Sequence, residues 1–211
     1  VGRNYEDHAR EMGGDAEREP PFFFMKPANS VVPAQNGKAE VPYPPMTGDY
    51  QHEIELVVAI GSVAYEIEKA QAREHITGYA VGLDMTRRDL QLQARNMGRP
   101  WELGKSFFMS APIGDLYLSS EIGHPKDAEI SVEVNGVTRQ SSNINMMIWS
   151  VEETIAYLSK FEPLLPGDII MTGTPKGVGA VNIGDVMTGK IDGLGSIIVS
   201  VVERNLGEYL S

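Results

Sequence analysis

The sequence predicts an α+β fold that is mainly β, a mixed and rolled β-sheet with short peripheral helices. Glycine and proline, 22 and 13 of the 211 residues, are spread along the chain and separate many short apolar runs, as turns separate strands. Candidate strands and helices do not alternate regularly, which argues against a doubly wound parallel sheet. Because we see no internal repeat and no domain boundary, we expect residues 1–211 to form a single domain.

The individual elements follow from local patterns. Asn135-Gly136 lies between β-forming residues and predicts a hairpin with a type I′ turn. Ser150 and Glu153 form a capping box ahead of a helix. We expect helices at residues 3–12, 66–76, 86–97 and 151–160. We expect strands at residues 22–25, 53–60, 79–84, 130–139 (the hairpin) and 169–172, and in a last β stretch that closes near residue 203. Over residues 33–50 we expect a loop with scattered extended pieces.

Composition excludes several classes of function. The formal net charge of −11, from 29 acidic and 18 basic residues, disfavours binding to nucleic acid or to an anionic membrane. Without cysteine, the chain forms neither disulfides nor thiolate metal sites, which fits the cytoplasmic location that we expect. No apolar run reaches the roughly 18–20 residues that cross a bilayer, and no signal peptide is evident. The chain begins at Val1 and not at Met, so we expect that upstream residues are missing.

Two carboxylates begin a strand that is otherwise apolar. Glu53 and Glu55 are two residues apart and therefore share one face of the strand, while Asp84 ends another apolar strand. Carboxylates held close together repel unless a cation lies between them, and an all-oxygen set suits Mg²⁺ or Mn²⁺, and Ca²⁺ less well. The pattern alone leaves an alternative open, in which Glu53 and Glu55 are exposed on an edge strand and Asp84 is a cap or turn residue.

Basic and polar residues follow these acids. Arg88 and Gln91 share a helix face, and Arg88 is placed to reach back towards Asp84, whereas Arg87 is expected to be exposed. Lys105 stands among apolar and aromatic residues, and Lys26 is similar. Either lysine is a snorkelling side chain or a cation that faces a substrate.

Two further segments contain groups that can bind an anion or act as a base. Residues 172–179, TGTPKGVG, form a Gly-rich loop after a strand that can present N–H groups and a hydroxyl to an anion, although a plain tight turn explains them equally well; the spacing is not that of a Walker A loop. His8 and Glu11 are three residues apart on the first helix, a pairing that makes imidazole a better base. A surface helix pair is the alternative. His52 adjoins the acidic pair and could support it.

Taken together, six segments closely resemble the fumarylacetoacetate hydrolase family and run in the order found there: GRNYEDHAREM (2–12), FFFMKPA (22–28), HEIELVVAIG (52–61), GYAVGLDMTRRDLQ (78–91), PWELGKSF (100–107) and PGDIIMTGTPKGVG (166–179). The resemblance implies the rolled β fold of that family's C-terminal domain, a single catalytic domain and a homodimer. It places the metal carboxylates on Glu53, Glu55 and Asp84, with Mg²⁺ expected and Mn²⁺ or Ca²⁺ as alternatives. It places the His8–Glu11 base pair on a mobile lid, residues 4–19. It assigns substrate contacts to Arg88, Gln91, Lys105 and Thr174, with Lys105 also catalytic.

The resemblance also implies an activity. A subgroup match in the segments around 18–28, 98–107 and 110–114 points to metal-dependent hydrolysis of a carbon–carbon bond in an acylpyruvate, fumarylpyruvate above all, in the breakdown of aromatic compounds. The substrate is then a small anionic keto acid. Three alternatives stay open: an oxaloacetate decarboxylase, which needs no attacking water; a muconate-type isomerase; and a non-catalytic cation-binding module, which has no use for a histidine–glutamate pair.

Overall fold

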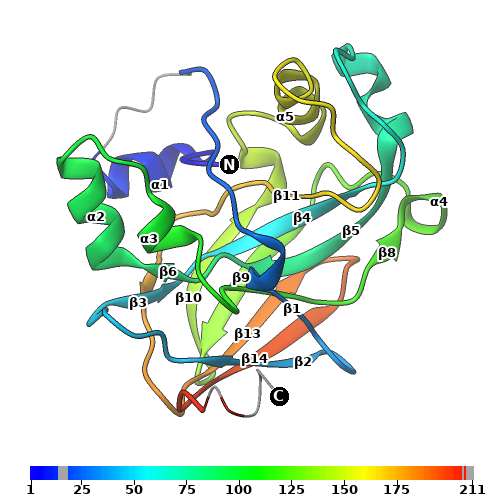
Figure 1. Ribbon diagram of the computed structural model, residues 1–211. Helices are drawn as coiled ribbons and strands as arrows, with labels where there is room; N and C mark the ends of the chain where they lie inside the picture. The colour runs from blue at the N-terminus through cyan, green and yellow to red at the C-terminus, as the bar shows by residue number, and fades with distance from the viewer. Residues whose placement is uncertain (14–18, 206, 208–211) are drawn as a thin grey trace.

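The computed structural model describes residues 1–13, 19–205 and 207, and shows mainly strands with short helices around them (Figure 1). The strands form sheets of six, five and three strands that mix parallel and antiparallel pairs. This curled mixed sheet confirms the predicted fold class. None of the helices in the described part of the chain is long and apolar enough to cross a membrane.

The six-stranded sheet holds the centre of the core. Its order is β1 (Val31–Pro33), β7 (Ala111–Ile113), β5 (Ile76–Leu83), β4 (Ile54–Ile60) and β11 (Ile169–Met171), with β8 (Tyr117–Leu118) paired to β5. Every residue of β4 is buried, because this apolar run is covered on both faces. β4 and β5 are antiparallel and in register from Ile54 opposite Leu83. The start of β4 therefore lies beside the end of β5.

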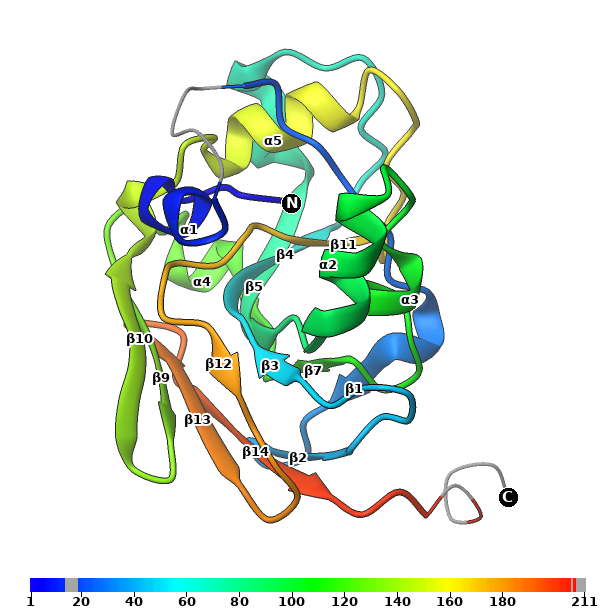
Figure 2. The same cartoon turned by 90° about the vertical axis from the view of Figure 1, so that its left-hand side faces the viewer.

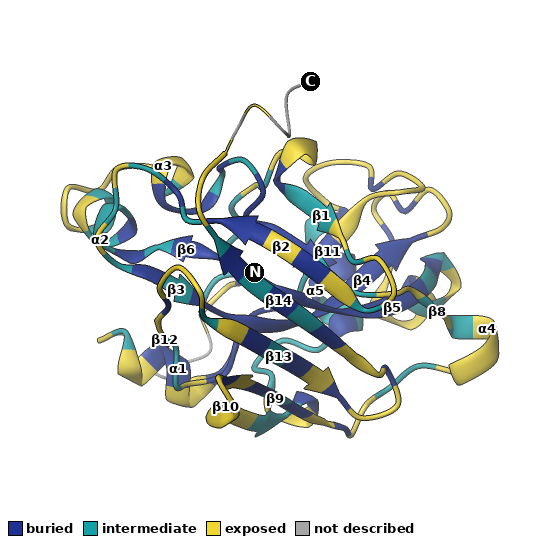
Figure 3. Cartoon of the chain, turned by 90° about the horizontal axis from the view of Figure 1, so that it is seen from below, coloured by how far each residue is buried: buried dark blue, intermediate teal, exposed yellow. Residues whose placement is uncertain are grey.

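The five-stranded sheet forms one side of the molecule, and α2, α3 and α5 lie on the opposite side from β13 and β14 (Figure 2). Its order is β10 (Val137–Asn143), β9 (Glu129–Val134), β13 (Val186–Ile191), β14 (Ser196–Val202) and β2 (Lys38–Pro42). Buried and exposed residues alternate along β13 and β14 (Figure 3), as expected when one sheet face packs on the core. Asn135 and Gly136 both have positive φ, 52° and 77°, so the hairpin turn is confirmed.

A small sheet links these layers to the helices. It has the order β12 (Gly179–Ala180), β3 (Tyr50–His52) and β6 (Thr86–Arg87). The helices are α1 (Glu6–Glu11), α2 (Arg88–Asn96), α3 (Glu102–Lys105), α4 (Ser119–Ile122) and α5 (Val151–Leu158), with 3₁₀ turns η1 (Ala28–Ser30), η2 (Lys69–His75) and η3 (Ile144–Met146). The capping box of Ser150 and Glu153 is present at α5. The helix expected at 66–76 is a 3₁₀ segment, capped by Glu68 and Gln71.

Two expectations are wrong. The run 22–25 is not a strand, because it has no partner strand and its rings instead pack on other aromatic residues: Phe22 contacts Trp101 and Phe23 stacks on Tyr157. Only Phe22 forms a β-bridge, with Gly2. Arg87 is half-buried and not exposed, since its guanidinium lies 4.3 Å from the centre of the Phe107 ring.

Candidate functional site

The structure brings the three predicted carboxylates together at the point where β4 begins and β5 ends. Glu53 precedes β4, Glu55 lies on it and Asp84 follows β5, and the backbone N–H of Asp84 donates to the carbonyl of Glu53 at 2.8 Å. One carboxylate oxygen from each lies within 4.8 Å of the others. All three side chains are buried, so the alternative of two exposed acids on an edge strand is wrong.

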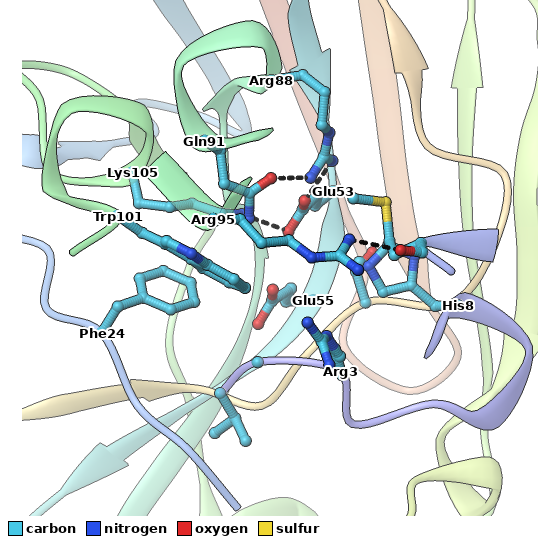
Figure 4. A pocket seen from close by; sticks show the side chains of 14 residues that line it. Arg3, His8, Phe24, Glu53, Glu55, Arg88, Gln91, Arg95, Trp101 and Lys105 are labelled. Atoms are coloured by element: carbon cyan, nitrogen blue, oxygen red, sulfur yellow. Dashed lines mark hydrogen bonds and ion pairs between the residues drawn. The ribbon is translucent and has the colours of Figure 1, made fainter. Parts of the chain in front are cut away.

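Lys105 and Arg88 compensate the charge of Glu53. The ammonium of Lys105 lies 2.7 Å from an oxygen of Glu53 and 2.7 Å from one of Asp84, and it is buried. Arg88 donates to Glu53 at 2.5 Å, and not to Asp84 as expected. Its guanidinium is held in this orientation because it also donates to Gln51 and to Gln91; Figure 4 shows its contacts with Glu53 and Gln91.

Lys26 forms an ion pair with Asp84. Its ammonium lies 2.8 Å from a carboxylate oxygen of Asp84 and donates to the carbonyls of Lys105, at 2.6 Å, and Ser110, at 3.1 Å. Burial lowers the pKa of Lys26, and Asp84 opposes that shift. Of the two roles that the sequence left open, neither fits, because the side chain is buried and is occupied by the protein itself.

The pKa values of Glu53 and Glu55 shift in opposite directions. Burial alone would raise the pKa of Glu53, but the charges of Lys105 and Arg88 outweigh it and hold that pKa far below its usual range. Burial raises the pKa of Glu55 to about 8, and the charges of Asp84 and Glu53 add to the shift. Glu55 accepts a hydrogen bond from the Gly173 N–H at 2.6 Å, a neutral donor. Glu55 is therefore the acid whose charge the protein compensates least.

This donor set fits a divalent cation. Buried carboxylates need a counter-charge, and within the described residues the ligand atoms that converge here are all carboxylate oxygens, the set that Mg²⁺ and Mn²⁺ prefer. A cation between Glu53, Glu55 and Asp84 would favour the ionised form of Glu55, which the protein alone disfavours.

His8 and Glu11 lie on α1 and face the same site. The Nδ1 of His8 is 3.0 Å from a Glu11 carboxylate oxygen, and His8 is only 5% exposed, so the pair is not an ordinary surface pair. Burial would raise the pKa of Glu11, but hydrogen bonds from His8 and the Gly177 N–H lower it overall. An ionised Glu11 accepts the proton of Nδ1, which leaves the lone pair of His8 on Nε2.

Thr174 is positioned by a residue that the sequence did not reveal. The side-chain amide of Gln140 donates to the Thr174 hydroxyl at 2.8 Å and to the Pro175 carbonyl at 2.7 Å. Its oxygen accepts from the Ile54 N–H and from His52, so His52 supports Gln140 and not the carboxylates. Because the Thr174 oxygen accepts from Gln140, its own proton is available for donation to a ligand. Gln140 gives no local signal, since it comes from the distant hairpin.

One pocket collects most of the predicted side chains, namely His8, Glu53, Glu55, Arg88, Gln91, Lys105 and Thr174. Glu11 and Asp84 stand directly behind them. The other lining residues, among them Arg3, Phe24, Arg95 and Trp101, were not predicted from the sequence. Arg95 could have been found, because residues 88, 91 and 95 lie on one face of α2. The position of Arg3 depends on tertiary structure alone.

Fold and site together define the class of protein. Residues 1–202 match the Fumarylacetoacetate (FAA) hydrolase C-terminal family, and the chain belongs to this family of enzymes. The resemblance found in the sequence is thus confirmed.

Similar proteins have several activities. A fumarylpyruvate hydrolase from Ralstonia sp is 46% identical over 187 residues, which are 89% of this chain and 95% of the relative. The crystal structure of fumarylpyruvate hydrolase from Pseudomonas aeruginosa in complex with Mn²⁺ and pyruvate is 60% identical, with a TM-score of 0.93, and the match covers 96% of this chain and 87% of the other. The human mitochondrial oxaloacetate tautomerase FAHD1 is 39% identical over 201 residues, 95% of this chain and 89% of the relative.

The raised pKa of Glu55 predicts that metal binding releases a proton. With a pKa of about 8, Glu55 is mostly protonated near neutral pH, and a cation must displace that proton. We expect the affinity for Mn²⁺ to rise by up to about tenfold per pH unit from about pH 7 and to level off above about pH 8. Titration calorimetry in two buffers of different ionisation enthalpy measures both affinity and proton release. Glu55→Gln should bind Mn²⁺ more weakly and release no proton. An affinity that does not change with pH over this range would contradict the assignment.

Proposed function

We propose that the protein hydrolyses a carbon–carbon bond in an acylpyruvate and that its substrate is fumarylpyruvate, which it cleaves to fumarate and pyruvate. One observation carries the proposal: His8, which is paired with Glu11, lines the same pocket as Glu53 and Glu55 of the carboxylate cluster. A base and a cation site side by side suit the activation of water next to a polarised keto acid. The names of the two bacterial relatives support the choice of substrate.

Glu53, Glu55 and Asp84 would hold the cation, Mg²⁺ or Mn²⁺. When bound, the cation would supply Lewis-acid polarisation of the pyruvoyl oxygens and a positive charge for the enolate that cleavage produces. The positive charges of Arg88 and Lys105, which both line the pocket, add to that stabilisation. The oxygen of the Thr174 hydroxyl accepts a hydrogen bond from Gln140. The proton of the same hydroxyl can therefore be donated to a substrate oxygen.

His8 is the group that accepts a proton from water. Its Nε2 carries the lone pair, and Glu11 stabilises the imidazolium that forms. The water oxygen then bonds to the carbonyl carbon on the acyl side, and the bond from that carbon to the methylene breaks. The electron pair of the broken bond stays on the pyruvoyl unit as an enolate, which takes up a proton and leaves as pyruvate. The acyl part leaves as fumarate.

A second candidate function is isomerisation of oxaloacetate, because several relatives are named oxaloacetate tautomerases. Tautomerisation and the decarboxylation of oxaloacetate need the cation and the enolate charges, but neither needs an attacking water. A muconate-type isomerase is a further candidate that needs no attacking water. The structure of 5-carboxymethyl-2-hydroxymuconate delta-isomerase from Mycobacterium smegmatis is 34% identical to this chain, with a TM-score of 0.84. The role of His8 separates these functions from hydrolysis. The homodimer, the cytoplasmic location and a place in aromatic catabolism stay predictions.

We further propose that α1 moves as a lid, as expected for residues 4–19, of which residues 14–18 lie outside the described part. Asn4 anchors its beginning through hydrogen bonds to Trp149 and Thr172. Past this point polar contacts join the helix to the Gly-rich loop, namely Glu11 with Gly177 and Asp7 with Lys176. The enclosed space of the pocket is about 20 Å³, enough for about one water molecule. A keto acid therefore enters only when the lining groups move.

We expect His8→Ala to lower the kcat for fumarylpyruvate by about 10²–10⁴-fold, the usual contribution of a general base. Glu11→Gln should give a smaller loss, since it removes the charge but keeps an acceptor. The Mn²⁺ affinity of His8→Ala should stay near that of the wild type, because His8 is not among the carboxylate ligands. His75→Ala, a histidine outside the pocket, serves as the control. Turnover of oxaloacetate should survive His8→Ala better than cleavage of fumarylpyruvate. Full hydrolysis by His8→Ala would reject His8 as the base.

The lid predicts a local change in hydrogen exchange. Addition of oxalate with Mn²⁺ should slow exchange of the amides of α1, residues 6–11, because a ligand that bridges the site holds the helix closed. Exchange in α5, residues 151–158, should stay the same and serves as the internal control. If the amides of α1 exchange equally with and without oxalate, α1 is not a lid.

A further inference from the structure

Two arginines of the pocket take no part in the carboxylate cluster. Arg3 comes from the N-terminal segment and Arg95 from the last turn of α2, and both side chains line the pocket. Figure 4 shows them projecting towards the pocket from these two separate parts of the chain. Both residues are half-buried, so their charges are partly removed from water. Such a pair of like charges needs an explanation.

Among the residues that the structure describes, neither charge is neutralised by an ion pair. Arg95 donates to the carbonyl of Met12 at 2.5 Å, which is a neutral acceptor. The guanidinium of Arg3 lies 5.6 Å from the centre of the Phe22 ring. Within residues 1–13 and 19–205, no carboxylate lies within ion-pairing distance of either guanidinium, whereas Arg88 and Lys105 are both paired with Glu53. Burial, and then the charge of Arg95, lower the pKa of Arg3, while Glu19 opposes the shift.

Guanidinium groups suit one ligand chemistry in particular. Their planar array of N–H donors matches a carboxylate, and two of them side by side can enclose both of its oxygens. In the proposed function, the carboxylate cluster and Lys105 bind the keto-acid end of the ligand. An anion at Arg3 and Arg95 is then a second anionic group of the same molecule. A bound carboxylate would also relieve the repulsion between the two arginines.

We propose that Arg3 and Arg95 bind the second carboxylate of the substrate, at the end of the acyl group, and thereby select dicarboxylic over monocarboxylic acylpyruvates. This inference rests on the proposed function, because it takes the pyruvoyl end to lie at the carboxylate cluster. Arg95 also joins this subsite to the lid, since its hydrogen bond to Met12 holds the chain just after α1. A dicarboxylate thus orders Arg95 and favours closure over His8.

The test compares two substrates that share the pyruvoyl end: fumarylpyruvate, with a second carboxylate, and acetylpyruvate, without one. Arg3→Gln and Arg95→Gln should each lower kcat/KM for fumarylpyruvate by about 10- to 100-fold, the usual effect of losing a charge-assisted hydrogen bond. For acetylpyruvate, kcat/KM should change by less than about threefold, which is well below that contribution. Arg99→Gln, which removes an exposed charge next to α2, is the matched control and should behave as wild type. Arg95→Lys should recover part of the loss.

Equal losses on both substrates would overturn the proposal, because they would show that the arginines only support the fold or the lid. No loss on either substrate would overturn it as well. A binding experiment separates this inference from the proposed hydrolysis. If the Mn²⁺-loaded wild type cleaves neither substrate, the proposed function fails, but calorimetry should still show that the wild type binds fumarate at least about tenfold more tightly than Arg3→Gln and Arg95→Gln do. Arg99→Gln should bind fumarate as the wild type does. Equal binding of fumarate by the wild type and by the two pocket variants would reject the subsite.

Discussion

The structure of this site depends on one constraint, the burial of three carboxylates in a single small volume. Glu53, Glu55 and Asp84 would repel one another strongly, and each needs compensation. Lys105 and Arg88 provide it for Glu53, whose pKa falls. Glu55 forms no ion pair among the described residues and accepts the Gly173 N–H, and its pKa rises to about 8. The protein thus compensates one acid least, and a divalent cation would supply the missing positive charge. Replacement of a single partner in such a cluster affects all the others.

The fold serves this site by separating rigid and movable parts. The acids stand on β4 and beside β5, in the most buried sheet, so their positions are fixed by packing. The proposed base stands on a short helix that is bound to the Gly-rich loop by Glu11 and Gly177. Thr174 in this loop is oriented by Gln140, which comes from the opposite sheet. A rigid cation site and a movable base allow a ligand to enter and then to be enclosed.

Local sequence patterns predicted the features that depend on neighbouring residues alone. The buried strand 54–60, the hairpin turn at 135–136 and the shared side of Glu53 and Glu55 follow from periodicity and turn chemistry, and the structure shows all three. The partner of Arg88 could not be predicted, because it depends on how α2 is placed against the strands. The roles of the site residues came from the family resemblance. The position of Arg3 in the pocket could not be predicted from the sequence, because it depends on how distant segments pack together.

In the proposed reaction, His8 activates a water molecule beside the cluster of Glu53, Glu55 and Asp84, and this water attacks the acyl carbonyl. The most direct measurement is the reaction of fumarylpyruvate with the Mn²⁺-loaded protein in water enriched in ¹⁸O, followed by mass spectrometry of both products. If the account is correct, one ¹⁸O atom enters the newly formed carboxylate of fumarate, after correction for exchange of the ketone oxygens measured without protein. Keto–enol interconversion of the substrate without cleavage, or fumarate formed with no ¹⁸O beyond the exchange background, would contradict it.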